Sequence, residues 1–308
     1  NAVSDLTSAS KLTPGLIISK GVNNGGATIF LRGVGSSPVQ LAFDQAVLIN
    51  VDNIPISKGR AIFETHMDME QIEVLKGPQA LFFGKNATAG IISIKTKDPG
   101  DELEVITKAG YNFEGRGPYG ELVVSTPLTD SLGVRVATRY SKLNHGYFEN
   151  IAQSIDGIPV DRFAPKNRDI AARATIAYDP GNAFDSKLKI SYSNNKTNDI
   201  NGMAQLVNCQ GPNGTPQPIF GIWASKGDDG CKLDKKHSIS AMEPGVAAQY
   251  PEARGGQPYN SYESILLSNT MNYDLGNMTL TAVTGYYDFN YETFGNFDIG
   301  TANVIYGH

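Results

Sequence analysis

Ile72-Glu-Val-Leu-Lys-Gly-Pro-Gln-Ala-Leu-Phe-Phe-Gly84, followed by Gly90-Ile-Ile-Ser-Ile94, is the stretch that decides the fold of the first third of this chain. It predicts a strand, a tight turn, a short helix, a glycine-rich turn and a second strand. Gly77-Pro78 ends the first strand, because proline fixes φ and lacks a backbone donor, and proline suits the first position of a brief helix over 79–83. Gly84 ends that helix, and Gly90 begins the next extended run.

The same alternation of short strands and helical pieces extends from residue 1 to about residue 98. A helix is predicted over 4–12, ending at Thr13-Pro14-Gly15 because the residue before proline avoids the α region. Strands are predicted at 16–19, 27–32, 46–51, 72–75 and 90–95. Asp98-Pro99-Gly100 ends the pattern. We therefore expect residues 1–98 to form a compact mixed α/β domain.

From about residue 102 onward the pattern changes to long strands of period two. In one of them, Leu132, Val134 and Val136 share one face, while Arg135 and Arg139 share the other. Strands are predicted at 102–111, 119–126, 131–143, 168–178, 186–194, 261–273 and 278–290. Such strands suit a transmembrane β-barrel, although a sandwich of antiparallel sheets shows the same alternation.

Connection lengths favour the barrel. Residues 127–130, 179–185 and 274–277 form short connections rich in turn residues, whereas 144–167 and 194–260 are long. This alternation is typical of tight periplasmic turns and long extracellular loops, and a structureless loop of about 60 residues is unexpected in a soluble domain. No apolar run reaches the roughly 18 to 20 residues of a membrane-spanning helix.

Composition excludes some functions. The 308 residues carry a formal net charge of −5, so no basic face is expected for nucleic acid. The 33 glycines, 14 tyrosines and 13 phenylalanines favour strands with many turns. No signal peptide is visible, and Asn1-Ala-Val-Ser-Asp5 resembles a start within a domain.

Cys209 and Cys231 are the two cysteines of the chain. Their place in one long polar segment predicts a disulfide, which would stabilise the fold by roughly 3 kcal/mol, and two free thiols are the alternative. A zinc site is less favoured, because His237 is the only nearby imidazole and no Cys-x-x-Cys spacing exists.

Ile29-Phe-Leu-Arg-Gly-Val-Gly35 and Val51-Asp-Asn-Ile-Pro55 precede the opening stretch. Together, the three motifs closely resemble the plug domain of TonB-dependent outer-membrane receptors. The resemblance implies a mixed α/β plug (1–98) inside an antiparallel transmembrane β-barrel of about 22 strands. About seven of those strands lie in residues 102–308, with extracellular loops at 144–167 and 194–260. It also implies the outer membrane of a Gram-negative bacterium, with outer-membrane lipid around the barrel.

The resemblance further implies active transport of a scarce nutrient, powered by the TonB protein through a segment upstream of residue 1. Ferric siderophore is the default substrate, an iron chelate; cobalamin, an oligosaccharide or a small aromatic compound are alternatives, and few His and Met residues make haem less attractive. A passive outer-membrane channel or a soluble β-rich binding protein are alternatives of another class. No nucleotide-binding or hydrolase motif is present, so we expect neither enzymatic activity nor a cofactor.

Two sets of site residues follow from the resemblance. The segments after the Arg-Gly and Asp-Asn-Ile-Pro motifs would form plug apices that bind ligand, through Ser37, Gln40, Lys58, Arg60 and Phe63. A polar cluster between plug and barrel would include Arg32, Glu73, Lys76, Arg135, Arg139 and Arg173. Glu64, Glu70 and Glu73 are the plug carboxylates that we expect the arginines to meet.

Metal binding has only a weak signal. Glu64, His66 and Asp68 alternate, so they would share one face of a strand. Further ligands are missing from the pattern, and we expect an ordinary polar surface there and no metal site.

Overall fold

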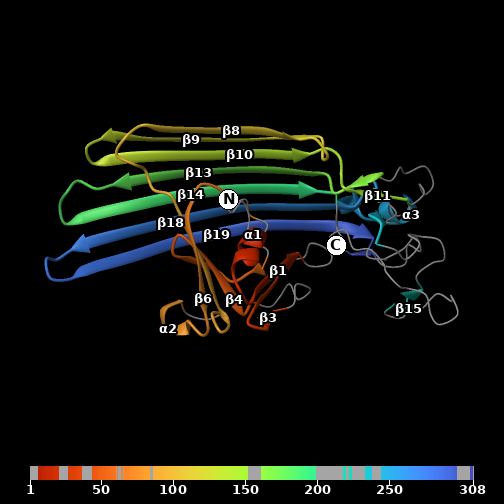
Figure 1. Ribbon diagram of the computed structural model, residues 1–308, viewed down its shortest axis with the longest axis horizontal. Coiled ribbons are helices and arrows are strands. Elements are labelled where there is room, and N and C mark those ends of the chain that lie inside the picture. Colours follow the sequence, from red (N-terminus) through yellow and green to blue (C-terminus); the bar gives the residue numbers. More distant parts are fainter. Residues whose placement is uncertain are drawn as a thin grey trace.

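The structure is a computed structural model that describes residues 6–20, 27–36, 44–59, 61, 64, 66–83, 86–151, 161–198, 218–219, 222–223, 233–237, 244–296 and 306–307. Two parts are distinct in it: a group of short elements near the N-terminus and a sheet of long strands (Figure 1). The short elements lie against one face of the long sheet.

The short elements form two small sheets with a helix beside each. The antiparallel sheet β1-β2-β3 follows the first helix, and the sheet β5-β4-β7-β6 contains one parallel pair, β4 with β7. The elements are α1 (Leu6–Leu12), β1 (Leu16–Lys20), β2 (Ala27–Leu31), β3 (Val34–Ser36), β4 (Val47–Val51), β5 (Ile54–Ile56), β6 (Met69–Lys76), α2 (Ala80–Phe83) and β7 (Gly90–Thr96). We call α1 to β7 the N-terminal unit.

Strands β4 and β7 form the centre of the N-terminal unit. Ile49 and Ile92 point to a core shared with β1 and β2, while Leu48 and Ile91 point to a second core shared with α2. Both faces of these strands are therefore covered, which explains their continuous apolar sequence. Burying each such side chain contributes roughly 1.5–3 kcal/mol.

Gly90 has a backbone that a side chain would disturb. Its φ is +152°, and a Cβ atom there would lie 2.3 Å from the carbonyl oxygen of Leu75 and 2.4 Å from a methyl carbon of Leu31. Glycine at the start of β7 therefore lets the two small sheets approach each other.

The long strands form one antiparallel sheet in the order β20-β19-β18-β14-β13-β10-β9-β8. We call this sheet the wall; within the described residues it is open, with β8 and β20 at its edges. Its strands are β8 (Glu104–Asn112), β9 (Gly117–Thr129), β10 (Leu132–Leu143), β13 (Asn167–Tyr178), β14 (Phe184–Thr197), β18 (Tyr259–Asp274), β19 (Thr279–Asn296) and β20 (Tyr306–Gly307). The seven strands predicted from the sequence are confirmed, and β19 continues beyond its predicted end at residue 290.

The two faces of the wall have opposite character. Val136 and Ile176 point away from the N-terminal unit and are 41% and 39% exposed, whereas Arg135, Ala137 and Arg173 point toward it and are buried. The apolar face is thus the uncovered one. A soluble sandwich would instead bury its apolar face between two sheets, so this arrangement contradicts the sandwich alternative.

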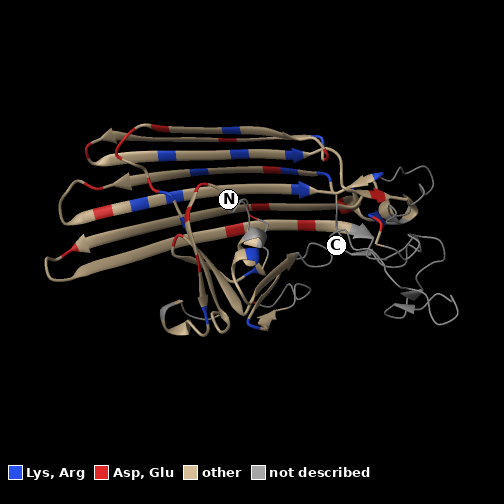
Figure 2. Cartoon of the chain, in the orientation of Figure 1, with Lys and Arg blue, Asp and Glu red and all other residues tan. Residues whose placement is uncertain are grey.

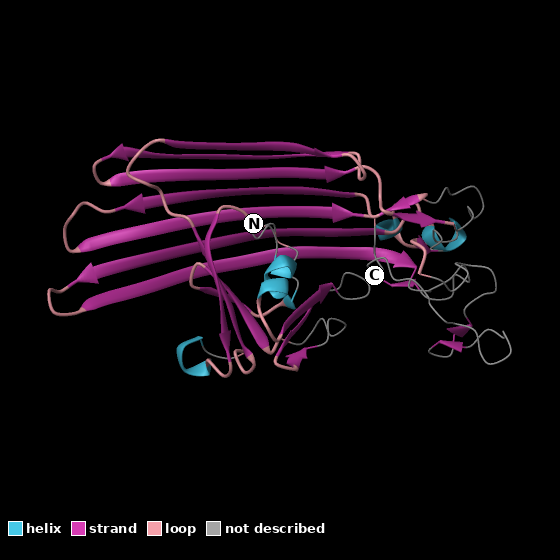
Figure 3. Cartoon of the chain, viewed as in Figure 1, coloured by secondary structure: helices cyan, strands magenta, loops and turns pink. Residues whose placement is uncertain are grey.

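Three short turns lie at one end of the wall, and both long connections lie at the other. The turns β9–β10, β13–β14 and β18–β19 lie together at one end, which we call the turn end (Figure 3). The connections β8–β9, β10–β13 and β14–β18 leave the wall at the opposite end, which we call the loop end. The small elements at the loop end are β11 (Phe148–Asn150), β12 (Phe163–Ala164), β15 (Pro218–Ile219), β16 (Ile222–Trp223), β17 (Lys236–His237), α3 (Pro244–Ala247) and the 3-10 helix Pro251–Ala253. Among the described residues, every helix is too short or too polar to cross a membrane.

Candidate functional site

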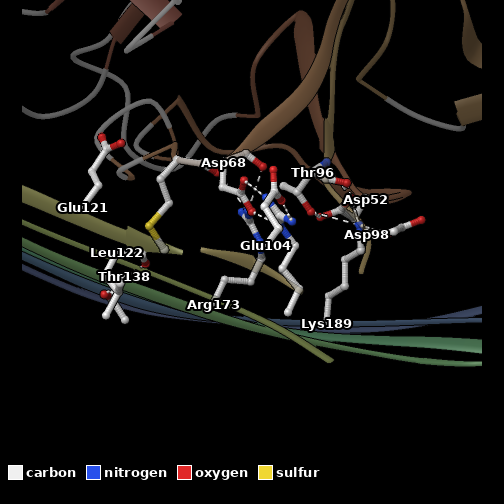
Figure 4. Close-up of polar contacts among 12 residues, drawn as sticks. Asp52, Asp68, Thr96, Asp98, Glu104, Glu121, Leu122, Thr138, Arg173 and Lys189 are labelled. Carbon is white, nitrogen blue, oxygen red and sulfur yellow. Dashed lines mark hydrogen bonds and ion pairs between the residues drawn. The ribbon is translucent and has the colours of Figure 1, made fainter. Parts of the chain in front are cut away.

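Charged side chains join the N-terminal unit to the inner face of the wall. They form two groups, each with two acidic and two basic members. The Asp68 cluster consists of Asp68, Glu104, Arg135 and Arg173, and the Asp52 cluster consists of Asp52, Asp98, Lys187 and Lys189. In Figure 4, Asp68, Glu104 and Arg173 lie side by side, with Asp52, Asp98 and Lys189 next to them.

Asp68 makes a two-pronged contact with β10. Arg135 donates from Nε to Oδ2 and from Nη2 to Oδ1, both at 2.7 Å. The third prong of the guanidinium, Nη1, donates to Glu104 at 2.6 Å. The side chains of Asp68 and Arg135 are 5% and 3% exposed. This parallel geometry matches the planar fork of arginine, and charge-assisted bonds of this kind are roughly twice as strong as neutral ones.

Arg173 of β13 holds the backbone beside the same carboxylate. Its Nη2 donates to the carbonyl oxygens of Met67 at 2.9 Å and Asp68 at 3.0 Å, and lies 3.3 Å from Asp68 Oδ2. Asp68 has a φ of +50°, a left-handed conformation that aspartate tolerates better than most residues. The turn before β6 is therefore held by both its side chain and its carbonyl groups.

Asp52 lies in the two-residue turn between β4 and β5. Asp52 and Asn53 both have positive φ, 47° and 68°, as expected for a tight hairpin whose twist matches its strands. The carboxylate accepts hydrogen bonds from Thr96 N at 3.0 Å and Thr96 Oγ1 at 2.7 Å. The end of β7 thus fixes the carboxylate in position.

Lys189 of β14 reaches this turn from the wall. Its Nζ donates to Asp52 Oδ1 at 3.0 Å and to both oxygens of Thr96 at 2.9 Å, and lies 2.9 Å from Asp98. Lys187 donates to Asp98 at 2.7 Å. Burial alone would raise the pKa of Asp98, but hydrogen bonds from Lys187 and Lys189 lower that pKa below its usual value.

The charges of each cluster balance, which has an energetic consequence. A buried charge is costly unless it is paired, and removing one partner of a buried pair costs about 3–5 kcal/mol because the other charge remains. The two clusters therefore fix where the N-terminal unit lies on the wall, even though each pair adds little net stability.

A third polar contact lies on β18 and β19. Tyr262 donates to Glu64 Oε1 at 3.1 Å, and its hydroxyl lies 2.5 Å from that of Tyr287. Burial raises the pKa of Glu64, and hydrogen bonds from Tyr287, Tyr262 and Ser264 only partly offset it. This carboxyl is thus held toward its neutral form, in contrast to Asp98, whose pKa is lowered.

A polar cavity of about 250 Å³ separates the N-terminal unit from part of the wall. It lies between β6 and β7 on one side and β14 and β18 on the other. Its lining includes Asp52, Glu73, Lys95, Lys187, Lys189 and Asn272. Water in such a cavity can replace hydrogen bonds between the two surfaces when they separate.

The predicted polar cluster is brought together only in part. Arg135 and Arg173 meet at Asp68, while Arg139 pairs with Glu121 inside the wall at 3.0 Å. The other three residues face different partners: Glu73 accepts from Gln71 at 2.6 Å, Lys76 donates to Pro14 O at 2.9 Å, and Arg32 is exposed in the turn between β2 and β3.

Most predicted ligand-binding residues lie outside the described residues, as do both cysteines. These are Ser37, Gln40, Arg60, Phe63, Cys209 and Cys231. Lys58 is described, and its Nζ lies 2.9 Å from Asp44 Oδ1. The hydrogen bond from Lys58 lowers the pKa of Asp44 to about 2, with further bonds from Ser57 and Asn86.

Sequence reasoning missed Asp52, Thr96, Asp98, Glu104, Lys187 and Lys189. A signal existed for Lys187 and Lys189, because both fall on the polar face of a predicted strand. Asp68 was noticed as a weak metal ligand, but the structure assigns it to two arginines. In the described part of the chain, no group of three His, Cys, Asp or Glu side chains is placed to hold a metal ion.

Comparison with known proteins gives concordant findings. Residues 1–91 match the family model described as TonB-dependent Receptor Plug Domain. The pesticin receptor of Yersinia pestis is 31% identical over 149 residues, covering 48% of this chain and 21% of that protein. The ferric enterobactin receptor PirA of Pseudomonas aeruginosa is 26% identical over 224 residues, covering 63% of this chain and 29% of that protein.

Solved structures agree on the fold. The ferric yersiniabactin uptake receptor FyuA of Yersinia pestis superposes with a TM-score of 0.70 at 20% identity, covering 96% of this chain and 39% of that receptor. The chain thus spans less than a third of the length of the two curated relatives. Its fold is that of a plug domain against the strands of an outer-membrane β-barrel.

Proposed function

We propose that this chain, which belongs to the TonB-dependent outer-membrane receptors, forms the plug and first barrel strands of a transporter that takes up a ferric siderophore. In this proposal residues 1–98 are the plug, 102–308 belong to the barrel, and the loops 144–167 and 194–260 are extracellular. The receptor lies in the outer membrane of a Gram-negative bacterium.

The character of the interface between plug and wall is the observation that carries the proposal. Arg135, Arg173 and Lys189 extend from the inner face of the wall to carboxylates and carbonyl groups of the N-terminal unit. A plug that must move needs contacts that water can replace, and hydrogen-bonded charges meet that need better than a continuous apolar contact. A passive diffusion pore has no use for a plug of this size.

The chemistry of the relatives supports an iron chelate as the substrate. Two of them are named for ferric enterobactin and ferric yersiniabactin, and this chain resembles them over plug and strands. We further propose that Ser37, Gln40, Lys58, Arg60 and Phe63 lie at plug apices that face the ligand. Lysine and arginine there would attract an anionic chelate, and phenylalanine would stack on it.

TonB is the proposed energy source, acting through a segment upstream of residue 1. The end of the plug next to the turn end of the wall would then face the periplasm. TonB would act on the plug, and the two charged clusters would set how strongly the plug resists displacement from the wall.

Uptake measurements test this function. The complete receptor that contains this chain is expressed in a receptor-deficient Gram-negative strain, with and without TonB, and supplied with radiolabelled iron on catecholate, hydroxamate and phenolate siderophores. We expect uptake of one siderophore class that disappears without TonB. Equal uptake in both strains would contradict active transport.

Substrate choice is tested separately by binding to the purified receptor. Quenching of its intrinsic fluorescence is measured with ferric siderophores, cobalamin, haem and oligosaccharides. Tight binding of cobalamin or a sugar, with none for any ferric chelate, would overturn the siderophore assignment while leaving the transporter class intact.

A further inference from the structure

Three cations lie in one row on the outer face of the wall, at its loop end. Lys142 of β10 is paired in register with Arg168 of β13, which is paired with Lys196 of β14. All three side chains are exposed. Blue segments mark the loop-end tips of these three strands in Figure 2. We call these three residues the cationic row.

The cationic row shares a face with the apolar side chains of the wall. Lys142 follows Val136 and Tyr140 at even spacing along β10, so all three point outward. Directly paired residues of antiparallel strands share a face, so Arg168 and Lys196 point outward as well. The basic groups therefore border the surface that lipid would cover, and they do not face the plug.

None of these three side chains forms an ion pair with any described residue, unlike the inner arginines and lysines. Glu263 is a carboxylate on the same face, opposite Asn194 in the register. That carboxylate accepts a hydrogen bond from Tyr192 at 2.7 Å. Asp169, next to Arg168 in sequence, points inward and accepts from Ser141. Three adjacent positive charges thus have no ion-pair partner in the described part of the chain.

The height of the row matches the boundary of a membrane. Lys142 lies ten residues from Leu132 along β10, which is about 33 Å of strand. With a strand tilt of about 40°, this corresponds to about 25 Å across the membrane, the height of the apolar band of such barrels. The row is therefore at the level of lipid headgroups, next to Tyr140 and Tyr192.

The opposite end of the same strands provides an internal comparison. Leu132, Tyr178 and Ser186 are paired in register there, and this row carries no charge. On the outer face of β10, β13 and β14, positive charge is thus restricted to the loop end. An asymmetric membrane whose outer leaflet carries phosphorylated glycolipid would meet positive charge where its phosphates lie.

We propose that Lys142, Arg168 and Lys196 bind the phosphate groups of a phosphorylated glycolipid in the outer leaflet. Neighbouring strands are about 4.8 Å apart, so the row spans about 10 Å and suits a headgroup with two phosphates. Arginine contributes a planar fork for phosphate oxygens, and the lysines contribute mobile point charges. This inference rests on the proposed outer-membrane orientation but not on the identity of the substrate.

Lipid binding to the complete receptor in dodecyl maltoside micelles tests the proposal. The probes are bisphosphorylated lipid A and its enzymatically dephosphorylated form, and lipid bound per receptor is counted by native mass spectrometry. Each basic residue near an anionic surface strengthens attraction about fivefold. We expect the unmodified receptor to prefer the phosphorylated form at least tenfold, and Lys142→Gln/Arg168→Gln/Lys196→Gln to lose that preference.

A matched control removes the same charge elsewhere at the loop end. Arg116, Lys235 and Lys236 are exposed and lie off the row, so Arg116→Gln/Lys235→Gln/Lys236→Gln is expected to keep the preference. Equal binding of both lipid forms, an unchanged triple variant of the row, or full competition by millimolar inorganic phosphate would each overturn the proposal.

Iron uptake separates this result from the proposed function. The triple variant is expected to retain uptake of the siderophore, because its three residues point away from the lumen. A receptor that binds lipid A as proposed but transports no iron chelate would contradict only the substrate assignment.

Discussion

The inner and outer faces of β10, β13 and β14 carry the same kinds of cation in opposite surroundings. Inside, Arg135, Arg173 and Lys189 are buried and each meets a carboxylate of the N-terminal unit or its neighbouring segment. Outside, Lys142 and Arg168 are exposed and unpaired among the described residues. A buried charge needs a partner of opposite charge, whereas a charge at the edge of an apolar band can bind a lipid headgroup.

Breaking the inner pairing is expected to have the largest effect. Asp68→Ala leaves Arg135 and Arg173 buried without their shared carboxylate, so docking of the N-terminal unit on the wall should weaken by about 3–5 kcal/mol. Hydrogen exchange of amides 69–76 in the complete receptor measures this opening. Asp161→Ala is the control, because its partner Lys166 is half exposed, and it should cost less than about 1 kcal/mol. Similar losses in the two variants would refute the special role of burial.

Placing a charge on the outer face should have the next largest effect. Val136 lies near the middle of the apolar face, and Val136→Arg is expected to destabilise the barrel by about 2–4 kcal/mol. The midpoint of denaturant unfolding in lipid vesicles measures this cost. Val136→Leu serves as the control and should unfold at the parent midpoint. A Val136→Arg receptor as stable as the parent would show that this face does not contact lipid.

The two lysines of β14 offer a finer comparison within the Asp52 cluster. Lys189 is 8% exposed and meets oxygens of three residues, while Lys187 is 44% exposed and, among the described residues, meets only Asp98. Lys189→Met should weaken docking by about 2–3 kcal/mol, and Lys187→Met by less than about 1 kcal/mol. Protease cleavage rates of the N-terminal unit rank the two variants. The reverse order would contradict the assigned geometry.

The pH dependence of docking should be the smallest effect, with two opposite parts. Asp98 has a lowered pKa, so its contribution is present above its ordinary pKa and is lost as pH falls through the lowered value. Burial raises the pKa of Glu64, so its contribution is present below its ordinary pKa and is lost as pH rises through the raised value.

Glu64→Gln separates these two parts. The amide keeps the hydrogen bond from Tyr262 but cannot ionise, so the loss of stability on the alkaline side should disappear while the acid side is unchanged. Calorimetry of the complete receptor at several pH values measures both. Glu73→Gln changes an exposed carboxylate of β6 and should leave the alkaline side as in the parent. An unaltered alkaline side in Glu64→Gln would disprove the assignment.

Period-two patterning explains why the wall was predictable. Strand side chains alternate strictly, so Val136 and Arg135 could be assigned to opposite faces from the sequence alone. The plug motifs were equally informative, because Pro78 fixes its own φ while Gly77 and Gly90 permit positive φ values that other residues avoid. Helix α1 and five of the seven strands of the N-terminal unit followed from such local signals, whereas the three-residue strands β3 and β5 were not predicted.

Partner choice across the interface was not predictable. Arg135 and Arg173 were expected to meet Glu64, Glu70 or Glu73, yet they meet Asp68. The left-handed backbone at Asp68 directs its carboxylate toward the wall. A single residue in this conformation produces no periodic pattern in the sequence. Side chains joined across more than 60 residues of chain depend on how two sheets dock.

A double-mutant cycle on Asp68 and Arg135 tests the central claim, that buried paired charges hold the N-terminal unit on the polar face of the wall. Asp68→Asn, Arg135→Gln and the double variant are compared with the parent by hydrogen exchange of the N-terminal unit in the complete receptor. We predict a coupling free energy of about 3 kcal/mol. A coupling below about 0.5 kcal/mol, with the two single effects simply adding, would contradict the claim.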